Sequence, residues 1–129
     1  MRTVEAKTPT VVELVELASV NEPRAQRLLE SDAVFIRVVE DGKTVGVSWA
    51  SGDGKQWLVG GNFVHPQYRR RGIATGMRNA LVEELRQQTV GRGILYGIHF
   101  VGGKEFYEAL GWKLVGRQRT AYRKFQGKL

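Results

Sequence analysis

The stretch that decides the fold of this chain is Val64-His65-Pro66-Gln67-Tyr68-Arg69-Arg70-Arg71-Gly72-Ile73-Ala74-Thr75-Gly76. It joins a predicted strand to a predicted helix, so the first backbone N–H groups of the helix and the positive end of its dipole face whatever lies above the loop. Phosphate is the natural ligand of such a helix start. Gly72 lets the backbone approach phosphate oxygens closely, and the small Ala74 leaves the helix start uncrowded.

The residues of this loop exclude two commoner phosphate-binding motifs. The Walker motif requires a Gly-Lys-Ser/Thr ending, which is absent, and Gly72-Ile73-Ala74 lacks the three-glycine spacing of the dinucleotide fingerprint. A surface turn that carries a solvated run of arginines is the alternative interpretation of the loop taken alone.

Regular apolar spacing predicts the elements on either side of the loop. Helical spacing and strand-like alternation follow one another without a repeat or a linker. The expected elements are helices over 11–18 and 23–29, strands over 34–38, 45–49 and 56–64, a helix over 73–88, a strand over 94–101, a helix over 104–110, and strands over 112–117 and 120–125. Their order predicts a mixed α/β or α+β sheet covered by helices, in one domain over residues 1–129.

Turn residues and glycines add detail to the predicted strands. Asp41-Gly42 predicts a tight hairpin turn, and we expect Val45, Val47 and Trp49 to share one face of the return strand. Gly60-Gly61 interrupts the next strand, which indicates a bulge or a close backbone approach by a ligand.

The composition suits a protein that folds by itself. Of 129 residues, 42% are hydrophobic, which is enough apolar material for one core. The chain has no cysteine, which excludes disulfides, thiolate metal sites and a cysteine nucleophile. The first residues lack the apolar run of a signal peptide and no later segment is long enough to span a membrane, so we expect a soluble, cytoplasmic protein.

The net charge of +7 is unevenly placed, because no Asp or Glu follows Glu108 while basic residues continue to Lys128. Such a field favours a polyanionic ligand. Nucleic acid fits it, and so do the phosphates of coenzyme A, so the charge alone leaves this choice open.

Two segments resemble the GNAT superfamily of acyl-CoA N-acyltransferases. The family's pyrophosphate motif, Arg/Gln-x-x-Gly-x-Gly/Ala, is similar to Arg69-Arg70-Arg71-Gly72-Ile73-Ala74, which also lies between a strand and a helix. One strand later, Phe106-Tyr107-Glu108-Ala109-Leu110-Gly111-Trp112 resembles the family's Phe-Tyr-Glu-Lys-Leu-Gly-Phe. The resemblance covers about residues 35 to 112, so the opening helices are less diagnostic.

The resemblance implies a fold and a coenzyme site. The expected fold is a mixed central sheet of about six to seven strands flanked by about four helices, in which two central parallel strands splay apart and admit the pantetheine arm of acetyl-CoA. Phe63 and Val64 are then the expected backbone contacts of that arm. The residues expected to bind the coenzyme are Phe63, Val64, Arg69, Arg70, Arg71, Gly72, Ile73, Ala74, Thr75 and Lys104.

The resemblance also suggests catalytic residues. Tyr107 matches the family's tyrosine that protonates the leaving thiolate, although an aromatic residue on a short helix is also a common core residue. No Asp or Glu lies between Lys55 and Val82, so the glycine-interrupted strand offers no carboxylate base. His65 is a candidate base, as are Glu40 and Asp41, but His65 is equally interpreted as a turn residue before a proline.

The expected activity is transfer of the acetyl group from acetyl-CoA to a primary amine by direct attack, with the Val64 N–H as a candidate oxyanion donor. The acceptor is an amine-bearing small molecule or protein, no metal or membrane is expected, and a homodimer is compatible with the sequence. Two other functions are retained. An acyl-CoA-binding module without transfer activity is favoured by the missing base and by Val101-Gly102-Gly103-Lys104, where the family often has an Asn. A nucleic-acid-binding domain is favoured only by the basic residues.

Overall fold

The computed structural model describes residues 1–52, 56–89, 94–100, 113–115 and 122–128. The elements are β1 (Arg2–Glu5), α1 (Val11–Ala18), α2 (Glu22–Glu30), β2 (Val34–Glu40), β3 (Lys43–Gly52), β4 (Gln56–Val64), the 3-10 helix η1 (Pro66–Tyr68), α3 (Ile73–Gln88), β5 (Ile94–Phe100), β6 (Lys113–Val115) and β7 (Tyr122–Lys128). The described strands form one sheet in the order β1-β2-β3-β4-β5-β7-β6. The α/β class expected from the sequence is confirmed.

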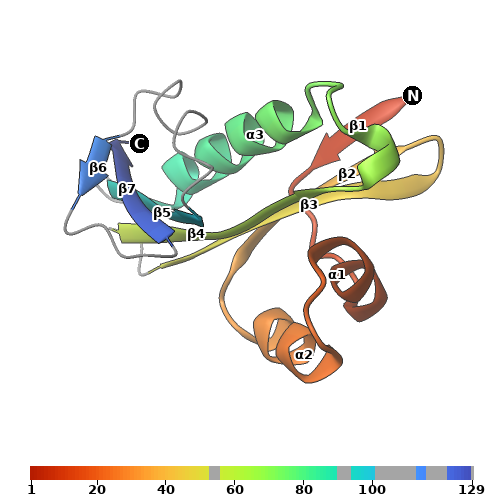
Figure 1. Ribbon diagram of the computed structural model, residues 1–129, viewed down its shortest axis with the longest axis horizontal. Helices are drawn as coiled ribbons and strands as arrows, with labels where there is room; N and C mark the ends of the chain where they lie inside the picture. The colour runs from red at the N-terminus through yellow and green to blue at the C-terminus, as the bar shows by residue number, and fades with distance from the viewer. Residues whose placement is uncertain (53–55, 90–93, 101–112, 116–121, 129) are drawn as a thin grey trace.

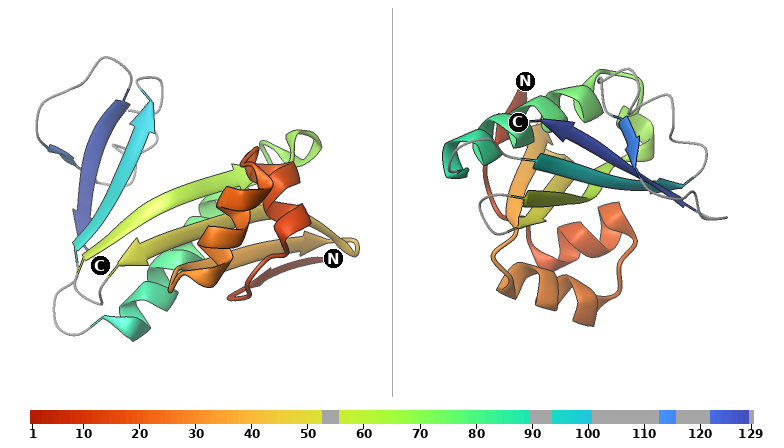
Figure 2. Two further views of the ribbon diagram at one scale, coloured as in Figure 1. Left: turned by 90° about the horizontal axis from the view of Figure 1, so that it is seen from below. Right: turned by 90° about the vertical axis from the view of Figure 1, so that its left-hand side faces the viewer.

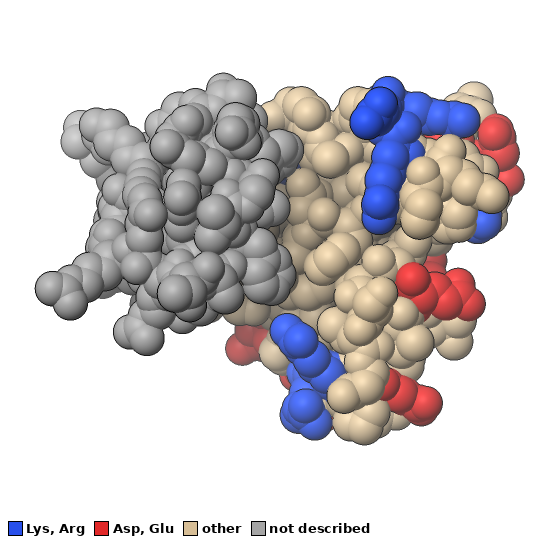
Figure 3. Space-filling view, in the orientation of Figure 1, with Lys and Arg blue, Asp and Glu red and all other residues tan. Residues whose placement is uncertain are grey.

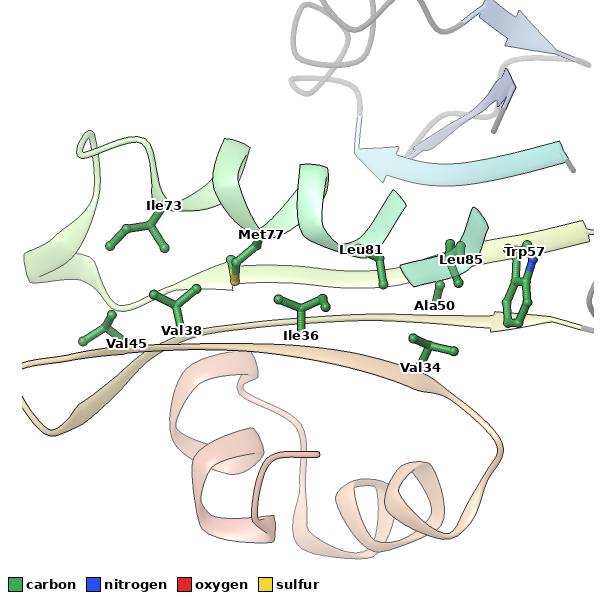
Figure 4. Packing of buried hydrophobic residues seen from close by; sticks show 10 residues of the cluster. All are labelled: Val34, Ile36, Val38, Val45, Ala50, Trp57, Ile73, Met77, Leu81 and Leu85. Atoms are coloured by element: carbon green, nitrogen blue, oxygen red, sulfur yellow. The ribbon is translucent and has the colours of Figure 1, made fainter. Parts of the chain in front are cut away.

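Helices cover both faces of the sheet. In Figure 1, α3 lies above the central strands and α1 and α2 lie below them. Two buried clusters correspond to these layers. One joins α3 to the sheet through Ile73, Met77, Leu81 and Leu85, which are all at most 2% exposed (Figure 4). The other joins α1 and α2 to residues of β2 and β3. The stripe of apolar residues four apart therefore directs α3 against the sheet, as expected.

The first two helices are defined by their caps. Thr10 and Glu13 form a capping box at the start of α1, in which each side chain accepts a hydrogen bond from the other residue's backbone N–H. Asn21 caps α2 by accepting from the Arg24 N–H at 2.9 Å, and Pro23 stands in the first turn. Both helices occur where the sequence predicted them.

The β2–β3 hairpin corrects one prediction. Asp41 and Gly42 have φ of 53° and 80°, as a tight two-residue turn requires. However, Val45 packs in the α3 cluster, whereas Val47 and Trp49 pack with α1 and α2. The register shifts at this point, because Val38 pairs with Gly46 but Val39 pairs with Thr44. The extra residue interrupts the alternation of faces that the sequence pattern assumed.

Strand β1 was not predicted. It lies at the edge of the sheet, antiparallel to β2, and three of its four residues are exposed. With so little burial it has no alternating apolar pattern to recognise. Long-range contacts hold it: the Glu5 carboxylate accepts from the Arg37 guanidinium at 2.6 Å, and the Arg2 guanidinium donates to the Arg71 carbonyl at 3.0 Å.

The glycine pair of β4 does form a bulge. Trp49 pairs with Gly61 and Ala50 pairs with Val59, so Gly60 is the extra residue. The close approach at this point is made by a side chain of the protein. A Cβ added at Gly60 would lie 2.1 Å from Trp49 Nε1, and one added at Gly61 would lie 2.5 Å from Trp49 Cη2. The indole of Trp49 therefore explains why both positions are glycine.

The contact of the Trp49 indole with the bulge predicts an effect on stability. Gly60→Ala is expected to lower the free energy of unfolding by about 2 kcal/mol, because the new methyl group overlaps the indole. Gly76→Ala is the matched control: its Cβ would meet nothing within 4 Å in the interior of α3, so a gain of about 0.5 to 1 kcal/mol is expected. Urea unfolding of both variants measures the difference, and equal losses would contradict the proposed packing.

Strands β4 and β5 pair in parallel over only part of their length. The pairs run from Gln56 with Ile94 to Val59 with Gly97, although β4 continues to Val64 and β5 to Phe100. Figure 2 shows the two strands starting side by side and then diverging. Strand β5 pairs on its other side with β7, antiparallel along its whole length.

The carboxyl-terminal predictions are tested only in part. Strand β6 lies within the strand predicted over 112–117, and β7 runs three residues beyond the end predicted for 120–125. The helix predicted over 104–110, with Tyr107 and Lys104, lies outside the described residues.

Candidate functional site

The loop after β4 has a backbone suited to anions. His65 caps η1, and Arg70 and Gly72 then adopt left-handed conformations with φ of 63° and 78° before α3 begins at Ile73. A left-handed arginine costs about 1 to 2 kcal/mol relative to an ordinary conformation, so the surrounding structure must impose it. The left-handed Gly72 directly precedes the helical residues of α3, so the loop turns sharply into the start of the helix.

The start of α3 contributes free donors to this site. Gly72 is its N-cap and supplies no side-chain hydrogen bond. The N–H groups of Ile73, Ala74 and Thr75 belong to the first helical turn and have no acceptor within the helix. With the positive end of the helix dipole, they attract a negative charge.

A pocket of about 440 Å³ opens at this helix start. Its lining combines the end of β4, η1 and the first turn of α3. The lining residues are Asn62, Phe63, Val64, Tyr68, Arg69, Arg70, Gly72, Ile73, Ala74 and Thr75. Eight of the ten residues predicted to bind the coenzyme thus surround one pocket. Arg71 does not line it, and Lys104 lies outside the described residues.

The three arginines have different environments. Arg69 Nε donates to the Val64 carbonyl at 3.3 Å, which ties the loop to the end of β4. The Arg71 guanidinium lies over the ring of Tyr68, 5.0 Å from its centroid, and Arg71 is not among the residues that line the pocket. Figure 3 shows Lys and Arg side chains gathered over η1 and the start of α3. This part of the surface is therefore positively charged.

Backbone alternation at the end of β4 decides which groups a ligand can reach. The His65 N–H donates to the Val45 carbonyl at 2.8 Å, so the polar backbone groups of His65 point toward β3. Because these groups alternate along an extended strand, the backbone N–H and C=O groups of Phe63 and Gly61 also point toward β3. The backbone groups of Val64 and Asn62 point the other way, to the side where β5 diverges. The backbone groups of Val64 and Asn62 are thus on the side of β4 that a ligand can reach, and those of Phe63 are on the β3 side.

The Phe63 side chain lies on the opposite face of the sheet from α3. Its ring stacks on Trp49, with centroids 5.7 Å apart, and 37% of the residue remains exposed. Phe63 therefore lines the pocket although its backbone polar groups face β3.

His65 behaves as a turn residue. Its Nδ1 accepts a hydrogen bond from the Gln67 N–H at 3.2 Å, which is the cap of η1, and its Nε2 lies 3.5 Å from Lys43 Nζ. A neutral imidazole that accepts at Nδ1 carries its proton on Nε2, so it has no free lone pair to act as a base. This geometry favours the structural interpretation of His65.

The hairpin carboxylates are also engaged. The terminal amine of Met1 donates to Asp41 at 2.8 Å, and this hydrogen bond lowers the pKa of the Asp41 carboxyl. Glu40 lies 3.7 Å from the Arg2 guanidinium. A carboxylate whose pKa is lowered is a weaker base, so Asp41 is poorly suited to deprotonate an amine.

Two lining residues, Asn62 and Tyr68, were not predicted from the sequence. The Asn62 Oδ1 atom is buried and has no hydrogen-bond partner among the described residues. A buried amide oxygen without a donor costs about 1 to 3 kcal/mol, so this oxygen favours a ligand that donates. The available signal was an amide residue in an otherwise apolar strand, directly after the glycine pair.

Sequence and structure comparisons identify the family. The profile described as the acetyltransferase (GNAT) domain matches residues 5–123. The chain belongs to the GNAT family of acetyltransferases. No curated protein matches it in sequence.

Solved structures share the fold of this GNAT domain at low identity. The ribosomal-protein-S18-alanine N-acetyltransferase from Escherichia coli has a TM-score of 0.84 at 15% identity, over 100% of this chain and 93% of that chain. An aminoglycoside 6'-acetyltransferase type Ii has a TM-score of 0.79 at 16% identity, over 97% and 96% of the two chains. An aminoglycoside 6'-N-acetyltransferase complexed with coenzyme A has a TM-score of 0.80 at 15% identity, over 98% and 96%.

Two further features of the GNAT domain concern metals and membranes. Within the described residues, no group of three or more His, Cys, Asp or Glu side chains is arranged to hold a metal ion. None of the described helices combines the length and apolar character needed to cross a bilayer.

Proposed function

We propose that this GNAT domain transfers the acetyl group of acetyl-CoA to a primary amine by direct attack. The pocket at the start of α3 carries the proposal, because a left-handed glycine there exposes backbone N–H groups beside a basic loop. The diphosphate of the coenzyme is the anion that fits it, bound by the N–H groups of Gly72 to Thr75. Arg69 and Arg70 lie beside these groups and supply positive charge.

The pantetheine arm is proposed to run from this pocket along the end of β4. Pairing with β5 stops at Val59, so the backbone groups of Val64 and Asn62 face the diverging side of the strand. The arm carries amide N–H and C=O groups that complement them, and one of its N–H groups suits the unpartnered Asn62 Oδ1. The thioester, at the far end of the arm from the diphosphate, then lies near the bulge at Gly60.

The chemistry is addition to a carbonyl followed by loss of a thiolate. The amine nitrogen forms a bond to the thioester carbon, and the carbonyl electrons move onto oxygen, where a β4 backbone N–H stabilises the charge. The nitrogen gives its extra proton to solvent, the C–S bond breaks, and the leaving thiolate takes a proton. We assign that proton to Tyr107 on the resemblance of its segment to the family motif, since the ordinary pKa of a phenol, about 10, is near that of a thiol.

The acceptor is proposed to attack as its free base. The described residues that line the pocket include no carboxylate, and His65 and Asp41 are held by other contacts. The amine then loses its proton to solvent before it enters. The solved relatives include enzymes named for a ribosomal-protein alanine and for aminoglycosides, which sets the range of acceptors to test.

A thiol-release screen tests the proposed function. We expect acetyl-CoA and one class of amine to yield free coenzyme A, in a panel of peptides with amino-terminal alanine, aminoglycosides, polyamines and amino acids. Calorimetry with coenzyme A is run beside it, and saturable binding is expected. Binding without thiol release from any amine would instead favour a module that binds acyl-CoA without transfer. Absence of binding would refute the proposal.

A further inference from the structure

A buried hydroxyl lies opposite the β4 bulge. Ser48 is 1% exposed, in the middle of β3, between the apolar residues Val47 and Trp49. A hydroxyl is costly to bury unless it forms a hydrogen bond. Ser48 Oγ donates to the Gly61 carbonyl at 2.9 Å. This contact is formed at the point where the β3–β4 register shifts, which makes it more than a routine way to satisfy a buried group.

The Gly61–Asn62 peptide directly follows the bulge. Gly60 has no partner of its own in the β3–β4 register, and Gly61 directly follows it. Pairing of Gly61 with Trp49 directs the Gly61 carbonyl toward β3, but the bulge interrupts the ladder directly before Gly61, so the pairing restrains this peptide from one side only. The hydrogen bond from Ser48 fixes the carbonyl of that peptide toward β3.

The same peptide supplies the N–H of Asn62. In a planar trans peptide the C=O and N–H groups point in opposite directions. A Gly61 carbonyl held toward β3 therefore directs the Asn62 N–H away from β3, to the side where β4 has no pairing with β5 beyond Val59. This N–H is closer to the bulge than that of Val64, which stands beside the phosphate loop.

We infer that Ser48 is a positioning residue for acyl transfer: it orients the Gly61–Asn62 peptide so that the Asn62 N–H donates to the carbonyl oxygen of the bound thioester. The inference rests on the proposed function, since it requires acetyl-CoA in the pocket. The donor meets an oxygen that becomes negative as the amine adds to the carbon, so its effect increases along the reaction. Ser48 itself does not touch the reacting atoms.

The test compares two ligands that differ only at the acyl group. Coenzyme A lacks the thioester carbonyl, so wild-type protein is expected to bind acetyl-CoA about fivefold more tightly than coenzyme A, the effect of one neutral hydrogen bond. Ser48→Ala should bind coenzyme A within twofold of wild type and lose the preference for acetyl-CoA. Calorimetry measures both affinities, and the backbone amide signal of Asn62 in NMR should respond to acetyl-CoA only in wild type.

Kinetics separate positioning from stability. With an amine from the screen, Ser48→Ala is expected to lower kcat about tenfold, and Ser48→Thr, which keeps the hydroxyl, should restore it. Ser51→Ala is the matched control, because it removes a hydroxyl from an exposed position of the same strand. Its kcat should equal that of wild type.

The outcomes distinguish the inference from the function that it rests on. Equal affinities of wild type for the two ligands, or an unchanged preference in Ser48→Ala, would overturn the role of Ser48 while leaving the coenzyme site intact. If Ser48→Ala weakened the binding of coenzyme A and acetyl-CoA equally, Ser48 would have only a structural role. If wild type bound neither ligand, the proposed function itself would fail.

Discussion

Replacing Gly72 with aspartate is expected to weaken coenzyme A binding about 100-fold, or about 2.7 kcal/mol. Gly72 is the N-cap of α3, and an aspartate side chain there would accept the same N–H groups that are proposed to hold the diphosphate. Its charge would also repel the phosphates. Calorimetric titration with coenzyme A measures the loss.

The fold should tolerate this change. A Cβ added at Gly72 would meet nothing within 4 Å, and aspartate adopts the left-handed conformation at φ of 78° more readily than most residues. The aspartate would also cap α3, which offsets part of the backbone strain. The unfolding midpoint is therefore expected to change little, so loss of binding would not reflect misfolding.

Gly42→Asp is the matched control for Gly72→Asp. Gly42 has φ of 80° and equally open surroundings, but it lies in the β2–β3 hairpin and does not line the pocket. It adds the same charge and a similar strain, so coenzyme A affinity should stay within twofold of wild type. Gly72→Asn adds a side chain of the same shape without the charge, and its affinity for coenzyme A should fall about tenfold. If Gly72→Asp bound coenzyme A as wild type does, the diphosphate site would be wrongly placed.

Tyr107→Phe is expected to lower kcat at least 100-fold, because the leaving thiolate would lose its proton donor; general acids typically contribute about 10²- to 10⁴-fold. The hydroxyl acts on the transition state and not on the bound coenzyme, so coenzyme A affinity should remain within twofold. Thiol release under saturating acetyl-CoA measures kcat, and calorimetry measures affinity.

A second phenol gives the control for Tyr107→Phe. Tyr122→Phe removes a hydroxyl from β7 and is expected to keep kcat within threefold of wild type. If Tyr107→Phe lowered kcat no more than this control with every amine in the panel, the proton would have to come from water or another residue.

The fold was predictable wherever short-range pattern determines the backbone. Helices α1 and α3 and strand β4 have the predicted bounds, because the spacing of apolar residues and the caps act within a few residues of one another. The prediction failed where a bulge shifted the alternation, as at Val45, and where an exposed edge strand had no pattern, as in β1.

The candidate site was predictable because its key feature is local. A strand, a basic turn with glycine and a helix follow one another directly in the sequence, so the free N–H groups at the start of α3 could be inferred from order alone. The orientation of each arginine could not be inferred from the sequence. Arg71 was expected at the coenzyme, but its guanidinium lies over Tyr68, a contact that depends on how the loop folds back on η1.

By itself, the sequence determined the α/β class, the hairpin turn, the bulge at the glycine pair and the glycine-containing loop before α3. Each follows from neighbouring residues, whose backbone preferences act at short range. Only the tertiary structure decided that Trp49 packs on the glycine pair, that Asn62 and not Phe63 turns its backbone to the diverging side of β4, and that Ser48 supports the intervening peptide. These contacts join residues on different strands, and their pairing is set by register, which a one-residue bulge changes and no local pattern records.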